Sequence, residues 1–425
     1  MENAPKSLRL QIGIFGRTNV GKSSFLNLIT SQDVSIVSAQ PGTTTDIVEK
    51  TMEFRPVGPV VFLDTAGVDD DSRLSTDRVK RTAAIFGRAD VFVVLTEAGQ
   101  WGRYEESLCG EANARGVPLI IVVNKTDISA LTDAFRERLV SITPNVMGCS
   151  CAGGRPGASA RTCANGADGT DGTDRETVIN TFKNILVNCI SENPAQPAIL
   201  VKDLLPPGGL AILVVPIDTG APQGRLILPQ VQTIRDILDG SGAALVVKDG
   251  EYADALAVLS KRPDLVICDS QAVQRVATET PEDIRLTTFS ILFARFKGEL
   301  DEFVRGTSAI NTLKKGDRVL VAESCAHHAG GDDIGRVKIP RMLRERTGLG
   351  DGVRIDFCNG RDYPDDLDRY SLIIHCGACM LTRREMLSRI GQAKNKNVPI
   401  TNYGLAISYF QGVLDRVVKP FLEKV

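Results

Sequence analysis

The sequence predicts an α/β protein of three domains, and three observations support this. The chain has 425 residues, whereas a single hydrophobic core stops growing at roughly 250–300 residues. Short apolar runs alternate with helical patterns along most of the chain, as in parallel sheets covered by helices. A linker with two prolines, 193–197, separates the first block of this alternation from the rest. We therefore expect domains at 1–192, 198–278 and 280–425.

The first domain is expected to be a doubly wound sheet. The predicted strands are 10–15, 60–63, 91–95 and 119–123, and the predicted helices are 22–29, 77–86 and 104–115. These strands are continuous apolar runs, as expected for strands that are buried on both faces. Residues 152–174 break the alternation because they are rich in Gly, Ala, Thr and Asp and almost free of apolar side chains. We expect them to form a mobile surface insertion.

The second domain repeats the same alternation on a smaller scale. Its predicted strands are 211–216, 244–247 and 265–268, and its predicted helices are 228–238 and 252–259. The segment contains no evident constellation of catalytic side chains. A small domain of this kind commonly serves as an association surface, so we expect it to be a dimerisation domain.

The third domain is expected to be a parallel sheet closed by one long helix from about residue 405. Its predicted strands are 318–322, 353–357, 372–375 and 399–402. The carboxyl ends of parallel strands share one edge, where open α/β folds build their sites. Cys325 follows the first of these strands and Cys376 follows the third. We therefore expect both cysteines at the same edge of the sheet.

The composition is that of an ordinary globular protein, with 43% hydrophobic and 24% charged residues. The net charge of −2 gives no reason to expect nucleic-acid binding, which requires Lys/Arg clusters. No apolar run approaches the roughly 18 residues of a membrane span, and residues 1–10 lack the apolar core of a signal peptide. We expect a cytoplasmic protein with reduced cysteines that binds neither nucleic acid nor membrane. Cys109, Cys189 and Cys268 lie in apolar stretches, which favours buried, unreactive thiols.

Residues 16–23 read Gly-Arg-Thr-Asn-Val-Gly-Lys-Ser and match the P-loop pattern. The context fits, because a predicted strand precedes the motif and a predicted helix follows it. Backbone N–H groups of such a loop and the N-terminus of its helix bind phosphate. We expect Lys22 to reach the β- and γ-phosphates and Ser23 to ligate Mg²⁺.

Two further motifs indicate that the nucleotide is GTP. Residues 64–67 read Asp-Thr-Ala-Gly, in which the carboxylate can hold the Mg²⁺ shell and the Gly67 N–H can sense the γ-phosphate. Residues 124–127 read Asn-Lys-Thr-Asp. Asp127 is placed to accept two hydrogen bonds from guanine that adenine cannot offer, and bonds to a charged group contribute roughly 1.5–3 kcal/mol each. The sequence therefore predicts a GTPase.

The remaining parts of this site are less sharply defined. Among three consecutive threonines, Thr44 is our choice for the second Mg²⁺ hydroxyl, with Thr43 and Thr45 as competitors. Val68 occupies the place of the water-orienting glutamine of Ras-like proteins, so intrinsic hydrolysis should be slow unless another group or a cation helps. The expected catalytic residues are Lys22, Thr44, Asp64 and Gly67, and the expected GTP-binding residues are Gly16, Asn19, Val20, Gly21, Lys22, Ser23, Ser24, Thr44, Asp64, Gly67, Asn124, Lys125, Asp127, Ser150 and Cys151.

All three histidines of the chain lie in two short segments that contain cysteine. Residues 325–328 read Cys-Ala-His-His and residues 375–379 read His-Cys-Gly-Ala-Cys. Three thiols with neighbouring imidazoles form a soft ligand set, which suits an iron–sulfur cluster or zinc and suits magnesium or calcium poorly. The candidate thiolate ligands are Cys325, Cys376 and Cys379.

The nucleotide motifs resemble those of TrmE-Era-EngA-like GTPases. With the two Cys/His segments added, the chain resembles the HydF family of [FeFe]-hydrogenase maturation GTPases over almost its whole length, residues 152–174 excepted. In the TrmE-Era group the P-loop asparagine, here Asn19, helps to hold a K⁺ ion that replaces an arginine finger. The resemblance to HydF implies a dimeric scaffold that binds GTP, Mg²⁺ and a [4Fe-4S] cluster. It further implies that radical-SAM maturases supply a diiron unit, which the protein transfers to apo-[FeFe]-hydrogenase.

Three cysteines leave one iron of a [4Fe-4S] cluster without a thiolate. His327, His375 and Glu323 are the candidate fourth ligands, and His328 is a weaker one. The histidines could instead form hydrogen bonds around the cluster.

Two other classes of protein also fit part of the sequence. A regulatory GTPase with a structural zinc domain would use the same cysteines. A ribosome- or tRNA-associated GTPase would fit the nucleotide motifs, but the neutral charge argues against it.

Overall fold

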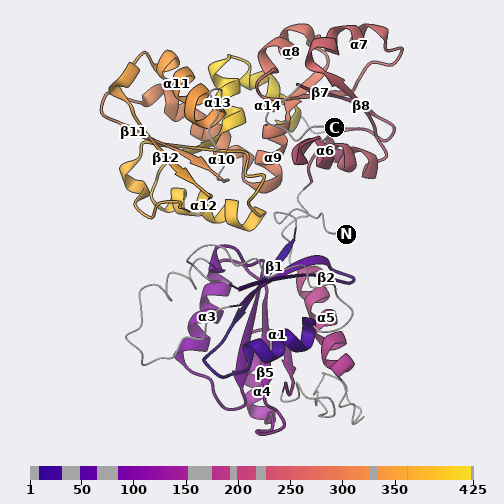
Figure 1. Cartoon of the computed structure of the whole chain (residues 1–425), viewed down its shortest axis with the longest axis vertical. Coiled ribbons are helices and arrows are strands. Elements are labelled where there is room, and N and C mark those ends of the chain that lie inside the picture. Colours follow the sequence, from indigo (N-terminus) through magenta and orange to yellow (C-terminus); the bar gives the residue numbers. More distant parts are fainter. Residues whose placement is uncertain are drawn as a thin grey trace. The chain divides into compact units, whose positions relative to one another are not determined.

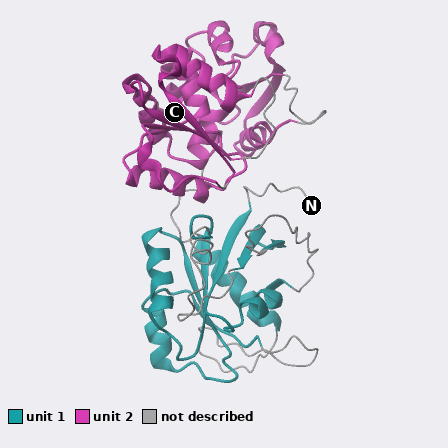
Figure 2. Cartoon of the chain, turned by 60° about the vertical axis from the view of Figure 1, so that its left-hand side comes forward, with its two compact units in different colours: residues 1–195 teal, residues 196–425 magenta. Residues whose placement is uncertain are grey.

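The structure is a computed structural model that describes residues 9–30, 48–64, 85–151, 175–191, 199–216, 226–324, 333–360 and 362–422. The chain forms two compact units, 1–195 and 196–425 (Figure 2). The expected helix at 77–86 lies mostly outside the described residues, and the expected mobile insertion at 152–174 lies wholly outside them.

The first unit is built on a six-stranded sheet of order β2-β3-β1-β4-β5-β6 (Figure 1). Its strands are β1 (Leu10–Phe15), β2 (Val48–Phe54), β3 (Gly58–Asp64), β4 (Val91–Glu97), β5 (Leu119–Asn124) and β6 (Val146–Gly148). Its helices are α1 (Lys22–Thr30), α3 (Arg103–Ala114), α4 (Asp133–Val140) and α5 (Arg175–Ser191). The β1, β3, β4 and β5 ranges lie within two residues of the predicted strands.

Helices cover both faces of this sheet, as predicted for a doubly wound domain. Alternate residues of β5 enter separate cores, because Ile120 and Val122 pack with the α1 and α5 side chains whereas Ile121 and Val123 pack with those of α3. The antiparallel edge strand β2 was not predicted. Its sequence alternates polar and apolar residues and contains no continuous apolar run, which was the signal used for the other strands.

The second unit contains two four-stranded parallel sheets, and the first has the order β10-β9-β7-β8. Its strands are β7 (Leu210–Val215), β8 (Ala243–Lys248), β9 (Leu265–Cys268) and β10 (Arg285–Thr288). Its helices are α6 (Leu228–Asp239), α7 (Tyr252–Val258), α8 (Val273–Glu279) and α9 (Phe289–Lys297).

The second sheet of this unit has the order β12-β11-β13-β14. Its strands are β11 (Arg318–Glu323), β12 (Arg354–Asn359), β13 (Leu372–His375) and β14 (Ile400–Asn402). The helices around it are α10 (Leu300–Thr307), α11 (Ile339–Thr347), α12 (Arg383–Asn395), α13 (Tyr403–Phe410) and α14 (Leu414–Leu422).

Two expectations for this region need correction. The boundary expected at 278–280 is too early, because β10 pairs with β9 and completes the first sheet. The single long C-terminal helix is two helices, α13 and α14, because Gly412 between them has a left-handed φ of 74° that a continuous helix cannot contain.

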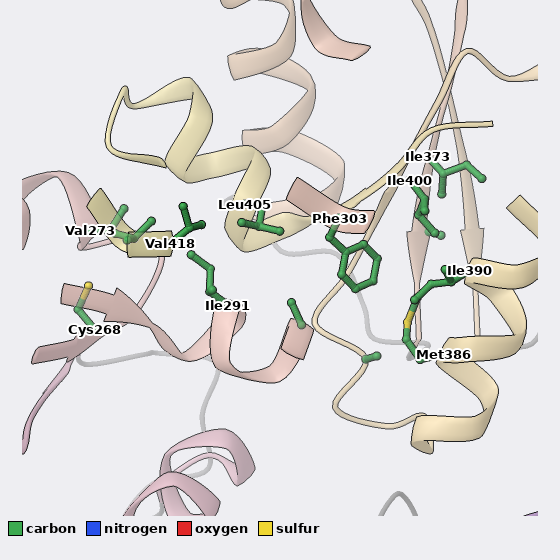
Figure 3. Close-up of a cluster of buried hydrophobic side chains, with 14 of the residues drawn as sticks. Cys268, Val273, Ile291, Phe303, Ile373, Met386, Ile390, Ile400, Leu405 and Val418 are labelled. Atoms are coloured by element: carbon green, nitrogen blue, oxygen red, sulfur yellow. The ribbon is translucent and has the colours of Figure 1, made fainter. Parts of the chain in front are cut away.

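The two sheets of the second unit share one hydrophobic core. Helix α14 packs against β10, so the end of the chain returns to the first sheet. Figure 3 shows Val418 of α14 near Val273 and Ile291, and the same cluster extends to Phe303 and Ile373 beside the second sheet. The middle and C-terminal segments therefore fold as one compact unit. Among the described residues, no helix is both long enough and apolar enough to cross a membrane.

Candidate functional site

The P-loop lies between β1 and α1, and its backbone requires glycine at two positions. A Cβ on Gly16 would lie 2.6 Å from the carbonyl oxygen of Leu95, and one on Gly21 would lie 2.2 Å from Asn124 Nδ2. Gly21 also has a φ of 96°. Both glycines therefore permit close approach of neighbouring segments, and Gly21 also permits a conformation that other residues rarely adopt. Asn19, at φ 64°, is exposed on the same loop.

The side chain of Lys22 is buried against its own loop. Its ammonium donates hydrogen bonds to the carbonyl oxygens of Gly16 at 2.9 Å and Arg17 at 2.7 Å. The position at the start of α1 places this charge where the helix N-terminus also attracts anions. The arrangement fits the expected role of Lys22 toward the terminal phosphates. Ser23 and Ser24 follow on the exposed side of α1.

The carboxylate of Asp64 lies at the end of β3, beside the P-loop. Burial raises its pKa, and Lys22, Lys50 and a hydrogen bond with the Ser23 side chain lower it in part. Its Oδ1 atom is buried and accepts no hydrogen bond from any described residue. A buried carboxylate oxygen and a neighbouring hydroxyl are the oxygen ligands that Mg²⁺ prefers. Asp64 and Ser23 therefore fit a magnesium site.

Asn124 links the P-loop to the loop after β6. Its amide nitrogen donates to the carbonyl oxygen of Val20 at 2.8 Å, and its Oδ1 accepts from the backbone N–H of Cys151 at 3.1 Å. One side chain thus holds together the two loops that were expected to contact the phosphates and the base. Ser150 and Cys151 are buried at this point.

The residues after Asn124 present the expected base-recognition group to solvent. Lys125 has a left-handed φ of 59°, and its ammonium forms an ion pair with Glu97 at 2.5 Å. Asp127, two residues later, is exposed. Its carboxylate is thus accessible to a ligand.

A clamp between the P-loop and α3 was not predicted. Arg17 donates two hydrogen bonds to the buried Glu105 carboxylate, at 2.8 and 3.0 Å, and Glu105 also accepts from the Gly102 N–H at 2.9 Å. Burial acts to raise the pKa of Glu105, but Arg17 and the Gly102 N–H outweigh burial and hold it below the usual value. Only the contact between Glu105 and the Gly102 N–H follows a local spacing, that of a glutamate three residues after an N-cap; no sequence pattern marks the contact with Arg17, 88 residues away.

Several expected site residues lie outside the described residues. They are Thr43, Thr44, Thr45, Gly67 and Val68 for the nucleotide site, and Cys325, His327 and His328 for the metal site.

The described part of the metal site lies at the carboxyl edge of the second sheet of unit 196–425. Strands β11 and β13 are parallel neighbours, with Ala322 opposite His375. The Cys376 sulfur accepts hydrogen bonds from the backbone N–H of Ser324 at 3.1 Å, and the Ser324 hydroxyl lies 2.9 Å from the same sulfur. Ser324 directly precedes Cys325 in the sequence, so the sheet brings the end of β11 against the segment that contains Cys376.

Cys379, another expected thiolate ligand, lies on the turn between Cys376 and α12. It is partly exposed, as is Cys376. Burial raises the pKa of the Cys379 thiol, Cys376 adds to that effect, and Lys297 opposes it. Within the residues that the structure describes, no three His, Cys, Asp or Glu side chains are grouped as a metal site. The third expected thiolate, Cys325, is outside that set.

The buried lysine beside these thiols was missed by the sequence analysis. Lys297, at the end of α9, donates to the carbonyl oxygens of Ala378, Cys379 and Leu381. Burial lowers its pKa to about 8, against the raising effects of Cys379, Glu385 and Cys376. A single lysine at the end of an apolar helix carries no sequence signal for such a contact.

Of the candidate fourth ligands, His375 has both ring nitrogens engaged. Arg389 approaches Nε2 at 2.8 Å, and Nδ1 lies 2.8 Å from the carbonyl oxygen of Cys376. Arginine can only donate, so Nε2 accepts and Nδ1 carries the proton. Burial, reinforced by Arg389, lowers the pKa of His375 to about 3. This neutral, fully buried ring fits the outer hydrogen-bonding role better than a ligand role.

Glu323 is buried at the end of β11 with only long contacts to described side chains. Tyr403 donates to Oε1 at 3.5 Å, and the Arg336 guanidinium lies 3.5 Å from Oε2. Gly335 makes room for both groups, because a Cβ there would lie 2.4 Å from Glu323 Oε1 and 2.3 Å from the Tyr403 hydroxyl. Glu323 thus remains a candidate ligand, and its contacts with Tyr403 and Arg336 are both long.

Comparison with family models covers most of the chain. Residues 301–420 match the hydrogen maturase F tetramerization domain, and residues 200–298 match the hydrogen maturase F dimerization domain. Residues 11–125 match the 50S ribosome-binding GTPase model. The boundary between the first two models, at 298–301, lies after α9, in agreement with the sheet to which β10 belongs.

Curated relatives match less than a third of this chain. A tRNA modification GTPase MnmE from a Synechococcus strain is 44% identical over 124 residues, which are 28% of this chain and 26% of that protein. GTPase Der from Deinococcus deserti is 37% identical over 129 residues, or 30% of this chain and 29% of that protein. The alignments thus span under a third of these relatives. The G domain of T. maritima FeoB, a solved structure, is 18% identical with a TM-score of 0.29 over 42% of this chain and 99% of that one.

Proposed function

We propose that this chain, which belongs to the HydF family of hydrogenase maturation GTPases, hydrolyses GTP in its N-terminal unit and carries a [4Fe-4S] cluster in its C-terminal unit. The proposed cluster site rests on the contact between Ser324 and the Cys376 sulfur. It brings the chain that leads into Cys325 against the second cysteine segment. The P-loop geometry and the buried Asp64 oxygen support the proposed GTP hydrolysis.

In the nucleotide site, the residues of this chain bind and orient GTP. Lys22 and the P-loop N–H groups would bind the phosphates, and Asp64 and Ser23 would hold Mg²⁺, which would supply charge stabilisation at the phosphates. Asn124 fixes the base loop to the P-loop. The exposed Asp127 carboxylate accepts the two guanine N–H groups.

Nucleotide choice tests the assignment of Asp127. Asp127→Asn should weaken GTP binding by at least about tenfold, because bonds to a charged acceptor are lost, and should favour xanthosine triphosphate. Equilibrium titration with fluorescent analogues measures both affinities. Asp133→Asn, an exposed carboxylate on α4, is the matched control and should change neither. Unchanged GTP affinity in the Asp127 variant would remove this residue from the base site.

Hydrolysis should depend on K⁺ through Asn19. The rate in KCl should exceed the rate in NaCl at equal ionic strength. Asn19→Gly should abolish this difference, since glycine accepts the left-handed φ of 64° and removes only the side chain. Equal rates of the parent in both salts would refute the potassium role without affecting the GTPase assignment.

In the C-terminal unit, Cys325, Cys376 and Cys379 would hold the cluster by three thiolates. The donor set fits, because thiolates favour iron–sulfur clusters and N–H donors to a ligating sulfur are typical of such sites. The cluster would supply an iron without a thiolate, at which an exchangeable ligand could bind. Glu323 and His327 are the leading candidates for that position and His328 is a weaker one, whereas the hydrogen bonds of His375 favour a supporting role beside Cys376.

Serine replacement of any one of these three cysteines should prevent stable cluster assembly. GTP hydrolysis should persist in each variant, because the nucleotide site belongs to the other unit. Cys268→Ala, in the core of the first sheet, is the control and should keep the cluster. Iron and acid-labile sulfide analysis after anaerobic reconstitution measures the outcome. A colourless protein that holds one zinc ion instead would establish the structural-zinc alternative.

Added imidazole or cyanide should change the electron paramagnetic resonance spectrum of the reduced cluster without dismantling it. Substituting Glu323 and His327 singly should identify which side chain occupies the position at rest. An unchanged spectrum in the parent and both variants would exclude an exchangeable position.

The cargo of this scaffold would be a diiron unit made by radical-SAM maturases and delivered to apo-[FeFe]-hydrogenase. The matched dimerization and tetramerization domain models support a protein that acts as an oligomer. Activation of purified apo-hydrogenase by protein loaded in the presence of both maturases tests delivery. Sedimentation of the same preparation tests the oligomer.

A further inference from the structure

Lys297 joins two parts of the second unit that the sequence places far apart. It is the last residue of α9, the helix that follows the first sheet, and it is only 2% exposed. Its Nζ atom donates to the carbonyl oxygens of Ala378 at 3.0 Å, Cys379 at 3.3 Å and Leu381 at 2.6 Å. These three carbonyls belong to the turn that carries two of the three expected cluster thiols. The contact therefore reaches from the middle segment to the cysteine turn.

The contacts indicate a charged lysine. A protonated amine has three N–H donors, whereas a neutral amine has two, and three carbonyl oxygens lie within hydrogen-bonding distance. At neutral pH a positive charge thus lies at the base of the cysteine turn.

A second contact joins the same two segments, with the donor now on α12 and the acceptors at the end of α9. Arg383, the first residue of α12, donates to the carbonyl oxygens of Arg295 at 3.3 Å, Phe296 at 2.6 Å and Gly298 at 3.3 Å. These are carbonyls at the C-terminal end of α9, where a helix leaves its oxygens without partners and favours cations. Each segment therefore contributes one cation to the backbone of the other.

The cysteine turn needs an external support of this kind. Ala378 has a left-handed φ of 53° and is 2% exposed. Such a conformation is uncommon for a residue with a Cβ and persists where the surroundings hold it. The hydrogen bond from Lys297 to the Ala378 carbonyl acts at this strained residue.

We propose that Lys297 is a positioning residue for the cluster: it fixes the turn from Cys376 to Leu381 and places a positive charge that raises the reduction potential of the cluster. This rests on the proposed cluster site. The positive charge should raise the potential because the reduced cluster carries one more negative charge than the oxidised cluster. A nearby cation stabilises the reduced form more, particularly in a poorly solvated environment.

The test uses three replacements in the full-length protein. Lys297→Met removes the charge and the donors at similar length, Lys297→Gln removes the charge and keeps a donor, and Lys297→Arg keeps the charge. Lys394→Met is the matched control, since Lys394 is an exposed lysine on α12 that forms an ion pair with Glu299. Hydrogen exchange of residues 376–382 is measured on cluster-free protein, and the reduction potential is measured on reconstituted protein.

In the cluster-free protein, Lys297→Met should accelerate exchange in residues 376–382 and leave β11 and β13 protected. In the reconstituted protein, the potential should fall in the Met and Gln variants and stay near the parent value in Lys297→Arg and Lys394→Met. If the Met variant fails to fold or to hold a cluster, the reduction potentials of the Gln and Arg variants are compared to test whether the charge of Lys297 raises the potential.

Equal potentials in the Gln variant, the Arg variant and the parent would overturn the electrostatic role. Unchanged exchange in residues 376–382 of the Met variant would overturn the positioning role. If the parent binds no cluster, the proposed function fails. The exchange measurement then still decides whether Lys297 holds the turn.

Discussion

Two buried lysines of this protein hold functional loops by their backbone carbonyls, one in each unit. Lys22 donates to Gly16 and Arg17, which precede it by six and five residues. Lys297 donates to the turn from Ala378 to Leu381, which follows it by 81–84 residues. The local chemistry is the same in both cases. The separation along the sequence differs more than tenfold. A lysine close to its loop can be predicted from one sequence motif, whereas a lysine 81 residues away cannot.

The two arrangements also depend on different parts of the fold. The P-loop and its lysine form one contiguous segment between β1 and α1. The cysteine turn lies next to the second sheet, but its supporting cation comes from a helix that follows the first sheet. We therefore expect the nucleotide site to respond mainly to changes in its own motifs, and the cysteine turn to respond to changes in the neighbouring segments of its unit.

The largest effect is expected from Lys22→Ala. Loss of one charge directed at the reacting phosphates should reduce GTP hydrolysis by about 10²–10³-fold, as for other electrostatic groups of active sites. Phosphate-release assays at saturating GTP measure this change. Cluster content should equal that of the parent. A combined loss of hydrolysis and cluster would contradict the separation of the two sites.

A smaller effect is expected from Gly335→Ala beside the cluster site. The new Cβ would lie 2.3 Å from the Tyr403 hydroxyl and 2.4 Å from Glu323 Oε1, and both side chains are buried. Overpacking of this kind costs about 1–3 kcal/mol. Gly391→Ala in α12 is the control, because no described atom beyond its neighbouring residues and the backbone of its own helix lies within 4 Å of its Cβ position. It should stabilise the protein by about 0.5–1 kcal/mol. Denaturant unfolding followed by circular dichroism compares the two variants.

Glu105→Gln should destabilise the first unit by about 1 kcal/mol at neutral pH, since Arg17 is partly exposed and such pairs are partly screened. The pKa of Glu105 lies below its usual value, so its contribution is present above the usual carboxyl pKa and is lost as pH falls through the folded-state pKa. The difference between parent and variant should therefore shrink below about pH 4.

Trp101 is a convenient probe for this measurement, because it is the single tryptophan of the chain and packs in the core beside α3. Denaturant unfolding at several pH values, followed by its fluorescence, gives the pH profile. A difference that stays constant down to pH 3 would assign the effect to packing and not to the charge.

The smallest effect is expected at Cys109. Burial raises the pKa of its thiol to about 11, with Glu105 and Glu106 adding to this effect. At pH 8 about one thiol in a thousand is ionised, and the thiolate is the reactive form. Iodoacetamide should therefore label the partly exposed Cys376 before Cys109 in cluster-free protein. Mass spectrometry should find Cys109 unmodified until the protein unfolds. Early labelling of Cys109 would show that the core around α3 opens readily.

The sequence by itself determined the parts of this protein that are contiguous. The P-loop, the strand ends at Asp64 and Asn124, and most strands of all three sheets were predicted from short patterns, because a motif or an apolar run is read within one segment. Cys376 was placed at the correct sheet edge for a topological reason, since all strands of a parallel sheet end on one side.

Tertiary structure decided what depends on contacts between distant segments. The strand β10 looks like part of the third domain until its pairing with β9 is known. The sequence leaves His375 open as a ligand or as a hydrogen-bonding neighbour of the cluster, and only the structure shows Arg389 at its second nitrogen. Lys297 carries no signal in the sequence, and only the structure shows its hydrogen bonds to the cysteine turn. The physical reason is that a hydrogen bond depends on distance in space, and only the folded chain brings residues separated by 14 or 81 positions within 3 Å of each other.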